Sequence, residues 1–140
     1  MIKNIFKKEK KIKIDNNVLI TALLVHAAKI DQNYTDIEKK IITRSSIELF
    51  NISSDKAEKL VVEAEKKEQE SNQIVEFTKE IKKYSMEFRL KIIEIIWKIV
   101  YSDGTSDNYE SNLIRRICGL LYVSDKESGI IKLKVQNLPK

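Results

Sequence analysis

Four carboxylates occupy equivalent places in two similar stretches of the sequence: Asp31, Glu38, Asp103 and Glu110. In each stretch the aspartate ends an apolar segment, and the glutamate follows seven residues later. Hard divalent cations such as Ca²⁺ and Mg²⁺ prefer carboxylate oxygens, so four such groups converging from two related turns could hold one. The motif is not an EF-hand, because the second stretch has Asn and Ile where that loop requires Gly and Glu.

The two glutamates also have a purely structural interpretation. Thr35 with Glu38, and Asp107 with Glu110, have the spacing of a capping box, in which the glutamate bonds back to the first amide of a helix. An aspartate at the C-terminal end of a helix is unfavourable, because the helix dipole is negative there. Both aspartates therefore need hydrogen bonds from turn amides or a nearby cation. Helix capping and cation binding both remain open at this point.

Helices must position these groups, because the composition favours helix: 34% of the residues are charged, and there are three glycines and one proline. Apolar residues recur at three- and four-residue spacing, whereas no stretch alternates with the period of a strand. The chain has the length of one domain. The pattern predicts an all-α bundle of about seven helices, over about residues 17–30, 35–50, 54–69, 74–84, 86–101 and 108–121, and from 124 onward.

The same periodicity predicts which side chains face the core. The helix over 86–101 is the most apolar and is expected to be central, with Glu94 and Lys98 spaced for an ion pair along it. In the second helix the apolar set is Ile37, Ile41, Ile42, Leu49 and Phe50, and in the last helix it is Ile130, Ile131 and Leu133. Ser124 with Glu127 gives the last helix a capping-box signal.

An internal repeat relates the two acidic stretches. A shift of 72 residues aligns identical residue types at five positions: Ile20 with Ile92, Asp31 with Asp103, Glu38 with Glu110, Ile42 with Ile114, and Arg44 with Arg116. Each unit is an apolar helix ending in Asp, a tight turn, and a second helix with Glu in its first turn. We therefore expect two pseudo-repeated helix-loop-helix units that superpose on each other.

These motifs resemble a known family. With Tyr101-Ser102-Asp103-Gly104 and Glu110, the earlier Asp31 and Glu38, and Phe88-Arg89-Leu90, the stretch from Val18 to about Val135 is similar to the TerB-like tellurite-resistance proteins. The resemblance implies an all-helical bundle whose acidic cluster holds a divalent metal, acting in bacterial stress or tellurite resistance, often near membranes. Related domains occur in membrane-associated co-chaperones. Gln32 stands where the family usually has glycine, and Ser102 where alanine is common, so the second turn is the better match.

The sequence argues against catalysis and against a small-molecule substrate. His26 is the only histidine, which excludes a site with several histidines, and we expect it to be structural. Ser45, Ser46 and Cys118 have no histidine spaced for a known nucleophile motif, and the scattered glycines form no phosphate-binding loop. The single cysteine excludes an internal disulfide and is expected to be a packed thiol, which fits the cytoplasm.

The net charge of +5 is concentrated at the N-terminus. Residues 1–15 carry six lysines against Glu9 and Asp15, a local charge of +4, which leaves +1 for the other 125 residues. We therefore divide the chain into a basic leader, 1–14, and a helical domain, 15–140. The leader is either a solvated terminus or an amphipathic segment that binds an anionic membrane surface. Nucleic acid is disfavoured, because the lysines lack interleaved aromatic residues other than Phe6 and no binding motif is present.

These features together predict a non-catalytic, cytoplasmic module that binds a protein partner and a divalent cation. The cation, Ca²⁺ or Mg²⁺, would be held by the four carboxylates. The alternative is a peripheral adaptor on the inner face of the membrane, or a co-chaperone-type interaction domain, that docks through its basic leader.

Overall fold

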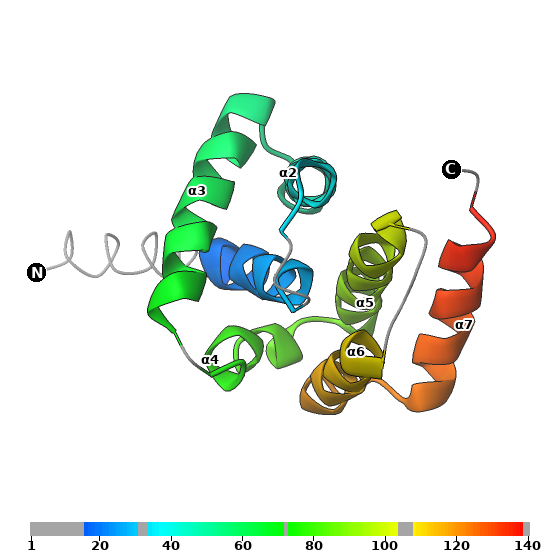
Figure 1. Ribbon diagram of the computed structural model, residues 1–140. Helices are drawn as coiled ribbons and strands as arrows, with labels where there is room; N and C mark the ends of the chain where they lie inside the picture. The colour runs from blue at the N-terminus through cyan, green and yellow to red at the C-terminus, as the bar shows by residue number, and fades with distance from the viewer. Residues whose placement is uncertain (1–15, 31–33, 72, 104–107, 139–140) are drawn as a thin grey trace, which may run out of the picture.

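The computed structural model describes residues 16–30, 34–71, 73–103 and 108–138, without the side chains of residues 103 and 108–111. A first helix covers residues 16–28. It is followed by α2 (Asp36–Phe50), α3 (Ser54–Glu70), α4 (Val75–Thr78), the 3₁₀ helix η1 (Ile81–Lys83), α5 (Met86–Val100), the 3₁₀ helix η2 (Tyr101–Asp103), α6 (Asn108–Leu120) and α7 (Asp125–Gln136). Every regular element of the described residues is helical, which confirms the predicted all-α fold (Figure 1).

Hydroxyl side chains cap the N-termini of four of these helices. The amide N–H three residues into the helix donates to the side-chain oxygen of Thr35 in α2, Ser53 in α3, Ser85 in α5 and Ser124 in α7. Such caps satisfy amides that have no partner within the helix. α2 ends at Asn51 in a left-handed conformation, φ 52°, which Asn tolerates better than most residues.

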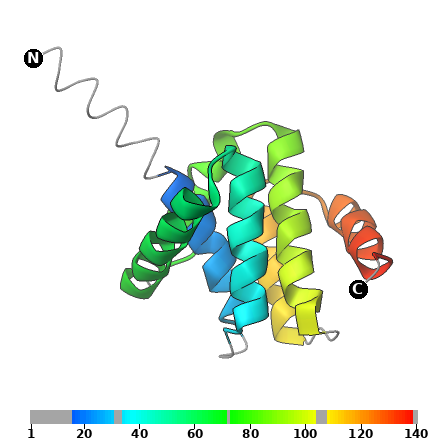
Figure 2. The same cartoon turned by 90° about the horizontal axis from the view of Figure 1, so that it is seen from above.

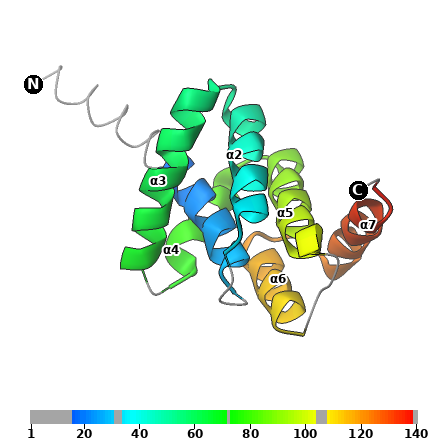
Figure 3. The same cartoon turned by 45° about the horizontal axis from the view of Figure 1, so that its top comes forward.

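The core is built around α5, as the sequence predicted. Seven of its fifteen residues are buried, all of them apolar and most of them isoleucine. α2 and α5 run side by side in opposite directions (Figures 2 and 3). α3 packs against α2, and α7 packs against α5 on the side away from α2 (Figure 1).

Polar contacts attach α7 to the second half of α5. Near the start of α7 the Trp97 indole N–H donates to the Ser128 hydroxyl at 3.2 Å, and farther along Lys134 pairs with Glu94 at 2.8 Å. The Lys132 ammonium lies 5.2 Å from the centre of the Trp97 ring. The expected pairing of Glu94 with Lys98 is therefore wrong, because Glu94 binds a cation from the neighbouring helix instead.

Several predicted core positions are also wrong. Ile37 of α2, and Ile130 and Leu133 of α7, are each about 60% exposed. The faces that these helices bury are rich in small polar residues: Ser45 and Ser46 accompany Ile42 in α2, and Ser128 accompanies Val135 in α7. Small hydroxyl side chains let helices approach closely once their polar atoms are satisfied, as when the Ser46 hydroxyl donates to the carbonyl of Ile42 at 2.9 Å.

Two expectations lie outside the described residues. One concerns the leader, residues 1–14. The other is that Asp31 and Asp103 occupy equivalent positions in the two pseudo-repeats, so the superposition of these repeats stays a prediction. Within the described part of the chain, no helix combines the length and apolar character that crossing a membrane requires.

Candidate functional site

Glu38 is the one residue of the acidic motif whose side chain the structure describes, and it caps a helix. The Thr35 amide N–H donates to Glu38 Oε1 at 2.8 Å, and the Glu38 amide donates to the Thr35 hydroxyl oxygen at 3.1 Å. The Thr35 hydroxyl adds a further bond to Oε1 at 3.0 Å. These contacts confirm the predicted capping box and leave only 7% of Glu38 exposed.

A polar network that joins α3 to the first helix and to α2 adjoins this cap. Glu68 binds His26 at 3.3 Å and Lys29 at 2.9 Å, and Lys39 pairs with Glu65 at 3.5 Å. Tyr34 lies among these groups, with the Lys29 ammonium 5.9 Å from its ring centre. Burial, reinforced by the negative charge of Glu65, raises the pKa of Tyr34 above its ordinary value.

The other three carboxylates of the motif are not described. Asp31 lies outside the described residues, and the same holds for the side chains of Asp103, at the end of η2, and Glu110, in the first turn of α6. Among the side chains that are described, no three His, Cys, Asp or Glu groups come together to hold a metal ion. The predicted ligand set therefore stays a prediction.

The described helix ends that flank the two acidic stretches nevertheless lie at one end of the bundle. The first helix ends, and α2 begins, at the same end of the molecule where α5 passes into η2 and α6 begins (Figures 2 and 3). Pairs of antiparallel helices produce this arrangement, because each connecting turn must lie where one helix stops and the next starts.

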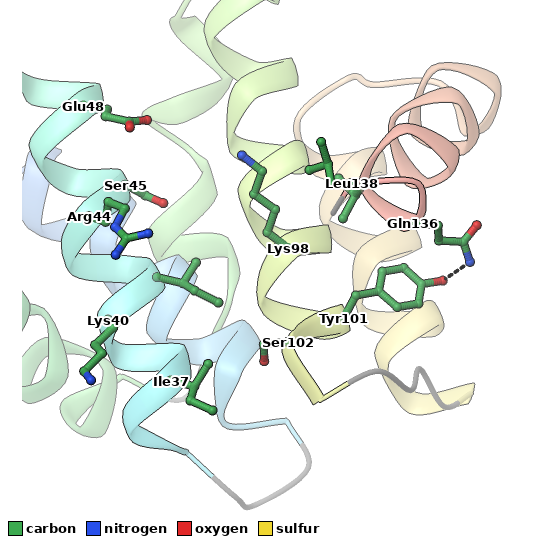
Figure 4. Close-up of a pocket in the computed structure, with 12 residues that line it drawn as sticks. Ile37, Lys40, Arg44, Ser45, Glu48, Lys98, Tyr101, Ser102, Gln136 and Leu138 are labelled. Atoms are coloured by element: carbon green, nitrogen blue, oxygen red, sulfur yellow. Dashed lines mark hydrogen bonds between the residues drawn. The ribbon is translucent and has the colours of Figure 1, made fainter. Parts of the chain in front are cut away.

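A groove of about 740 Å³ opens beside this end of the molecule (Figure 4). α2 forms one wall, the end of α5 and η2 form the floor, and the end of α7 forms the other wall. Its volume lies within the range of about 300–1,000 Å³ that is usual for ligand pockets. The lining residues are Ile37, Lys40, Ile41, Arg44, Ser45 and Glu48 of α2, Lys98, Tyr101 and Ser102 of the floor, and Val135, Gln136 and Leu138.

The charge in this groove is predominantly positive. The lining contains three cations, Lys40, Arg44 and Lys98, and one carboxylate, that of Glu48, so its net charge is +2. Among the ion pairs within the described residues, none includes any of these three cations. The groove thus combines an apolar surface with cations that have no counter-ion in the described part of the chain.

Sequence reasoning missed this groove, and one signal could have indicated it. Ile37, Ile41, Ser45 and Glu48 follow each other at three- and four-residue spacing, which is one face of a helix. The same face continues into the flanking Lys40 and Arg44. An apolar strip bordered by unpaired cations is as compatible with a binding face as with a core face.

The remaining candidates for chemistry are packed into the structure. His26 contacts Phe77 at a ring distance of 6.1 Å in addition to Glu68. Cys118 is buried, as expected. Burial raises the pKa of its thiol, and this effect is larger than that of a hydrogen bond with Ser128, which lowers the pKa. A thiol of raised pKa is a poor nucleophile.

Comparison with known proteins gives one match. The family model described as tellurite resistance protein TerB matches residues 17–133, from the first helix into α7. No curated protein and no solved structure matches the chain.

Proposed function

Because the chain belongs to the TerB family of tellurite resistance proteins, we propose that it is a non-catalytic binding module of a bacterial tellurite-resistance or stress system. It binds a divalent cation, Ca²⁺ or Mg²⁺, and recruits a protein partner. The cation ligands in this proposal are the paired carboxylates of the acidic motif: Asp31, Glu38, Asp103 and Glu110.

The observation that carries the cation-binding part is the position of Glu38. Its carboxylate is almost completely buried and is held in place by the cap bonds from Thr35. A carboxylate has about four lone-pair sites, so capping through Oε1 does not by its chemistry prevent coordination of a cation. The described helix ends next to the other three ligands lie at the same end of the bundle, which supports a shared site.

The packing of the reactive residues supports a non-catalytic role. Catalysis requires groups that converge on one reacting atom. His26 is instead paired with Glu68, and Cys118 is enclosed in the core with its pKa raised.

Thermal unfolding in Ca²⁺, Mg²⁺, Mn²⁺ or a chelator tests the cation site. A ligand that binds the folded state stabilises it by about 2.7 kcal/mol at a hundredfold excess over its dissociation constant, a clear rise in Tm. Glu38→Gln and Glu110→Gln keep the shape of a capping residue but remove an anionic oxygen, so each should lose most of that rise. Asp103→Asn should weaken the site more than Asp31→Asn, because Gly104 suits the second turn.

Glu127→Gln is the matched control, since Glu127 occupies the same third position of α7 after a Ser124 cap but lies outside the motif. It should keep the full cation-dependent shift. If the unsubstituted protein shows no shift with any cation, or if Glu38→Gln retains it undiminished, Glu38 is a helix cap alone and the cation site is wrong.

A further inference from the structure

The groove between α2, α5 and α7 leaves apolar side chains in contact with solvent. Ile37 is 60% exposed and Leu138 is 42% exposed, one on each wall, although Val135 beside Leu138 is buried. Single exposed apolar residues are common on protein surfaces. Ile37 and Leu138 instead line opposite walls of the same groove, together with Ile41 and Tyr101.

Within the described part of the chain, Lys98 is available because the carboxylate nearest to it along α5 has another partner. Glu94, one helical turn before Lys98, is paired with Lys134 of α7. Lys40 and Arg44 follow one another by one turn along α2, and Lys98 extends from the floor toward that wall (Figure 4). The three positive charges therefore line the apolar surface instead of gathering at a single point.

The walls are already fixed in position. The Gln136 amide donates to the Tyr101 hydroxyl at 2.8 Å, and the Tyr101 ring stacks on Trp97 at 5.7 Å. These contacts join the end of α7 to the floor. A surface that is ordered before binding loses less conformational entropy on association, which favours affinity.

We infer that this groove docks an acidic amphipathic segment of a protein partner, with its apolar side chains against Ile37 and Leu138 and its carboxylates on Lys40, Arg44 and Lys98. The inference specifies the partner of the proposed function and rests on it. Charge selects this occupant, because the chain's own leader, residues 1–14, has a net charge of +5 and is repelled by a lining of +2. The three cations are distributed over one turn of α2 and the floor, so they can pair with several carboxylates better than with a single lipid headgroup.

Selection from a library of random peptides tests the inference. Peptides of about 15 residues, long enough for about four helical turns, are displayed and selected on the folded full-length chain in the presence of a chelator. We expect the enriched sequences to carry net negative charge and apolar residues at three- and four-residue spacing. The most enriched peptide is then synthesised, and its Kd is measured by fluorescence anisotropy.

Charge reversal in the groove should weaken that peptide. We expect the double variant Arg44→Glu, Lys98→Glu to raise Kd by about tenfold or more, because two attractive charge pairs become repulsive. Lys82→Glu makes the same type of change on an exposed lysine of η1 outside the groove, and it should alter Kd by less than about twofold. Ile37→Ser, which keeps the charge, provides a second groove variant and should also weaken binding.

Enriched peptides without acidic bias, or equal affinity for the unsubstituted chain and both groove variants, would overturn the inference. So would vesicles of phosphatidylcholine and phosphatidylglycerol that displace the acidic peptide, because the occupant would then be lipid. A dimer in sedimentation velocity that the double variant dissociates would assign the groove to a second copy. Since the chelator removes divalent cations, failure of the cation site leaves these results unchanged and is recognised separately by the Tm measurements.

Discussion

The buried carboxylate of Glu38 accepts hydrogen bonds from a backbone amide and a hydroxyl group. An isolated buried carboxylate is costly, and hydrogen bonds to the charged form offset that cost. The bonds from Thr35 serve this purpose and also fix where the carboxylate lies. A cation ligand needs the same two properties, retained charge and fixed position, so the cap prepares Glu38 for the proposed role.

Tyr34 should make the stability of the protein depend on alkaline pH. Burial and the charge of Glu65 raise the pKa of its phenol in the folded state above the unfolded value of about 10. Above that pH the unfolded chain releases the proton while the folded chain retains it, so the free energy of unfolding falls as pH rises. The contribution is at most about 1.4 kcal/mol per pH unit, reduced by screening because the ring is partly exposed.

The measurement is urea unfolding from about pH 9 to about pH 11, across the unperturbed phenol pKa, for the unsubstituted protein and for Tyr34→Phe. The hydroxyl of Tyr34 is buried close to Glu65 but makes no hydrogen bond of standard geometry to a described residue, so Tyr34→Phe should be close to the unsubstituted protein in stability at neutral pH. At alkaline pH it should lose less stability than the unsubstituted protein. If the unfolding free energies of the two proteins fall in parallel as the pH rises, Tyr34 is not the source of the pH dependence.

At the scale of elements, the attachment of α7 depends on a buried serine. Ser128 is 6% exposed and accepts the N–H of the buried Trp97. Ser128→Ala leaves that donor without a partner, and an unsatisfied buried polar group costs about 1–3 kcal/mol. We expect chemical denaturation to show a loss of unfolding free energy in this range.

Ser46→Ala is the control for this substitution. Ser46 is equally enclosed, but its hydroxyl donates to a carbonyl within its own helix, which keeps a backbone partner when the hydroxyl is removed. Alanine also favours helix, so the change in stability should be within about 0.5 kcal/mol. If the two variants lose equal stability, the bond from Trp97 does not anchor α7.

The sequence predicted the helices better than it predicted their faces. Cap residues such as Thr35 and Ser124 act through local hydrogen bonds, and spacing alone reveals them. The buried faces of α2 and α7 depend on which neighbour each helix meets. Because Ser45, Ser46 and Ser128 are polar, hydropathy assigns them to the surface and places Ile37 and Leu133 in the core instead.

The candidate site was likewise predictable only in part. The acidic motif is local, so Glu38 and its cap could be identified from Thr35 and the three-residue spacing. The groove joins α2, α5 and α7, which are far apart in the sequence. That Lys98 has no ion-pair partner among the described residues depends on the pairing of Glu94 with Lys134, which only the tertiary structure reveals. No local pattern contains that information.

At the scale of the whole molecule, positive charge is concentrated in two parts of the sequence, the leader and the residues that line the groove. The leader, residues 1–14, has a net charge of +5, while the groove lining has +2 within a domain whose total is close to neutral. Like charges do not pair, so the two regions should serve different partners. An acidic protein segment fits the groove because apolar residues lie beside its cations, and an anionic membrane surface is the candidate for the leader.

Vesicle binding tests the role of the leader directly. Each Lys or Arg near an anionic surface contributes about 1 kcal/mol, so the full chain should co-sediment with vesicles containing phosphatidylglycerol more strongly than a shortened chain that begins at Asp15. The difference should shrink at high salt, because the Debye length falls from about 10 Å at 0.1 M to about 3 Å at 1 M. Vesicles of phosphatidylcholine alone, and the groove variant Arg44→Glu, Lys98→Glu in the full chain, are the controls. If the groove variant no longer binds the vesicles while the shortened chain still does, the groove and not the leader binds the membrane. If the full chain, the shortened chain and the groove variant bind equally, residues 1–14 are a solvated terminus.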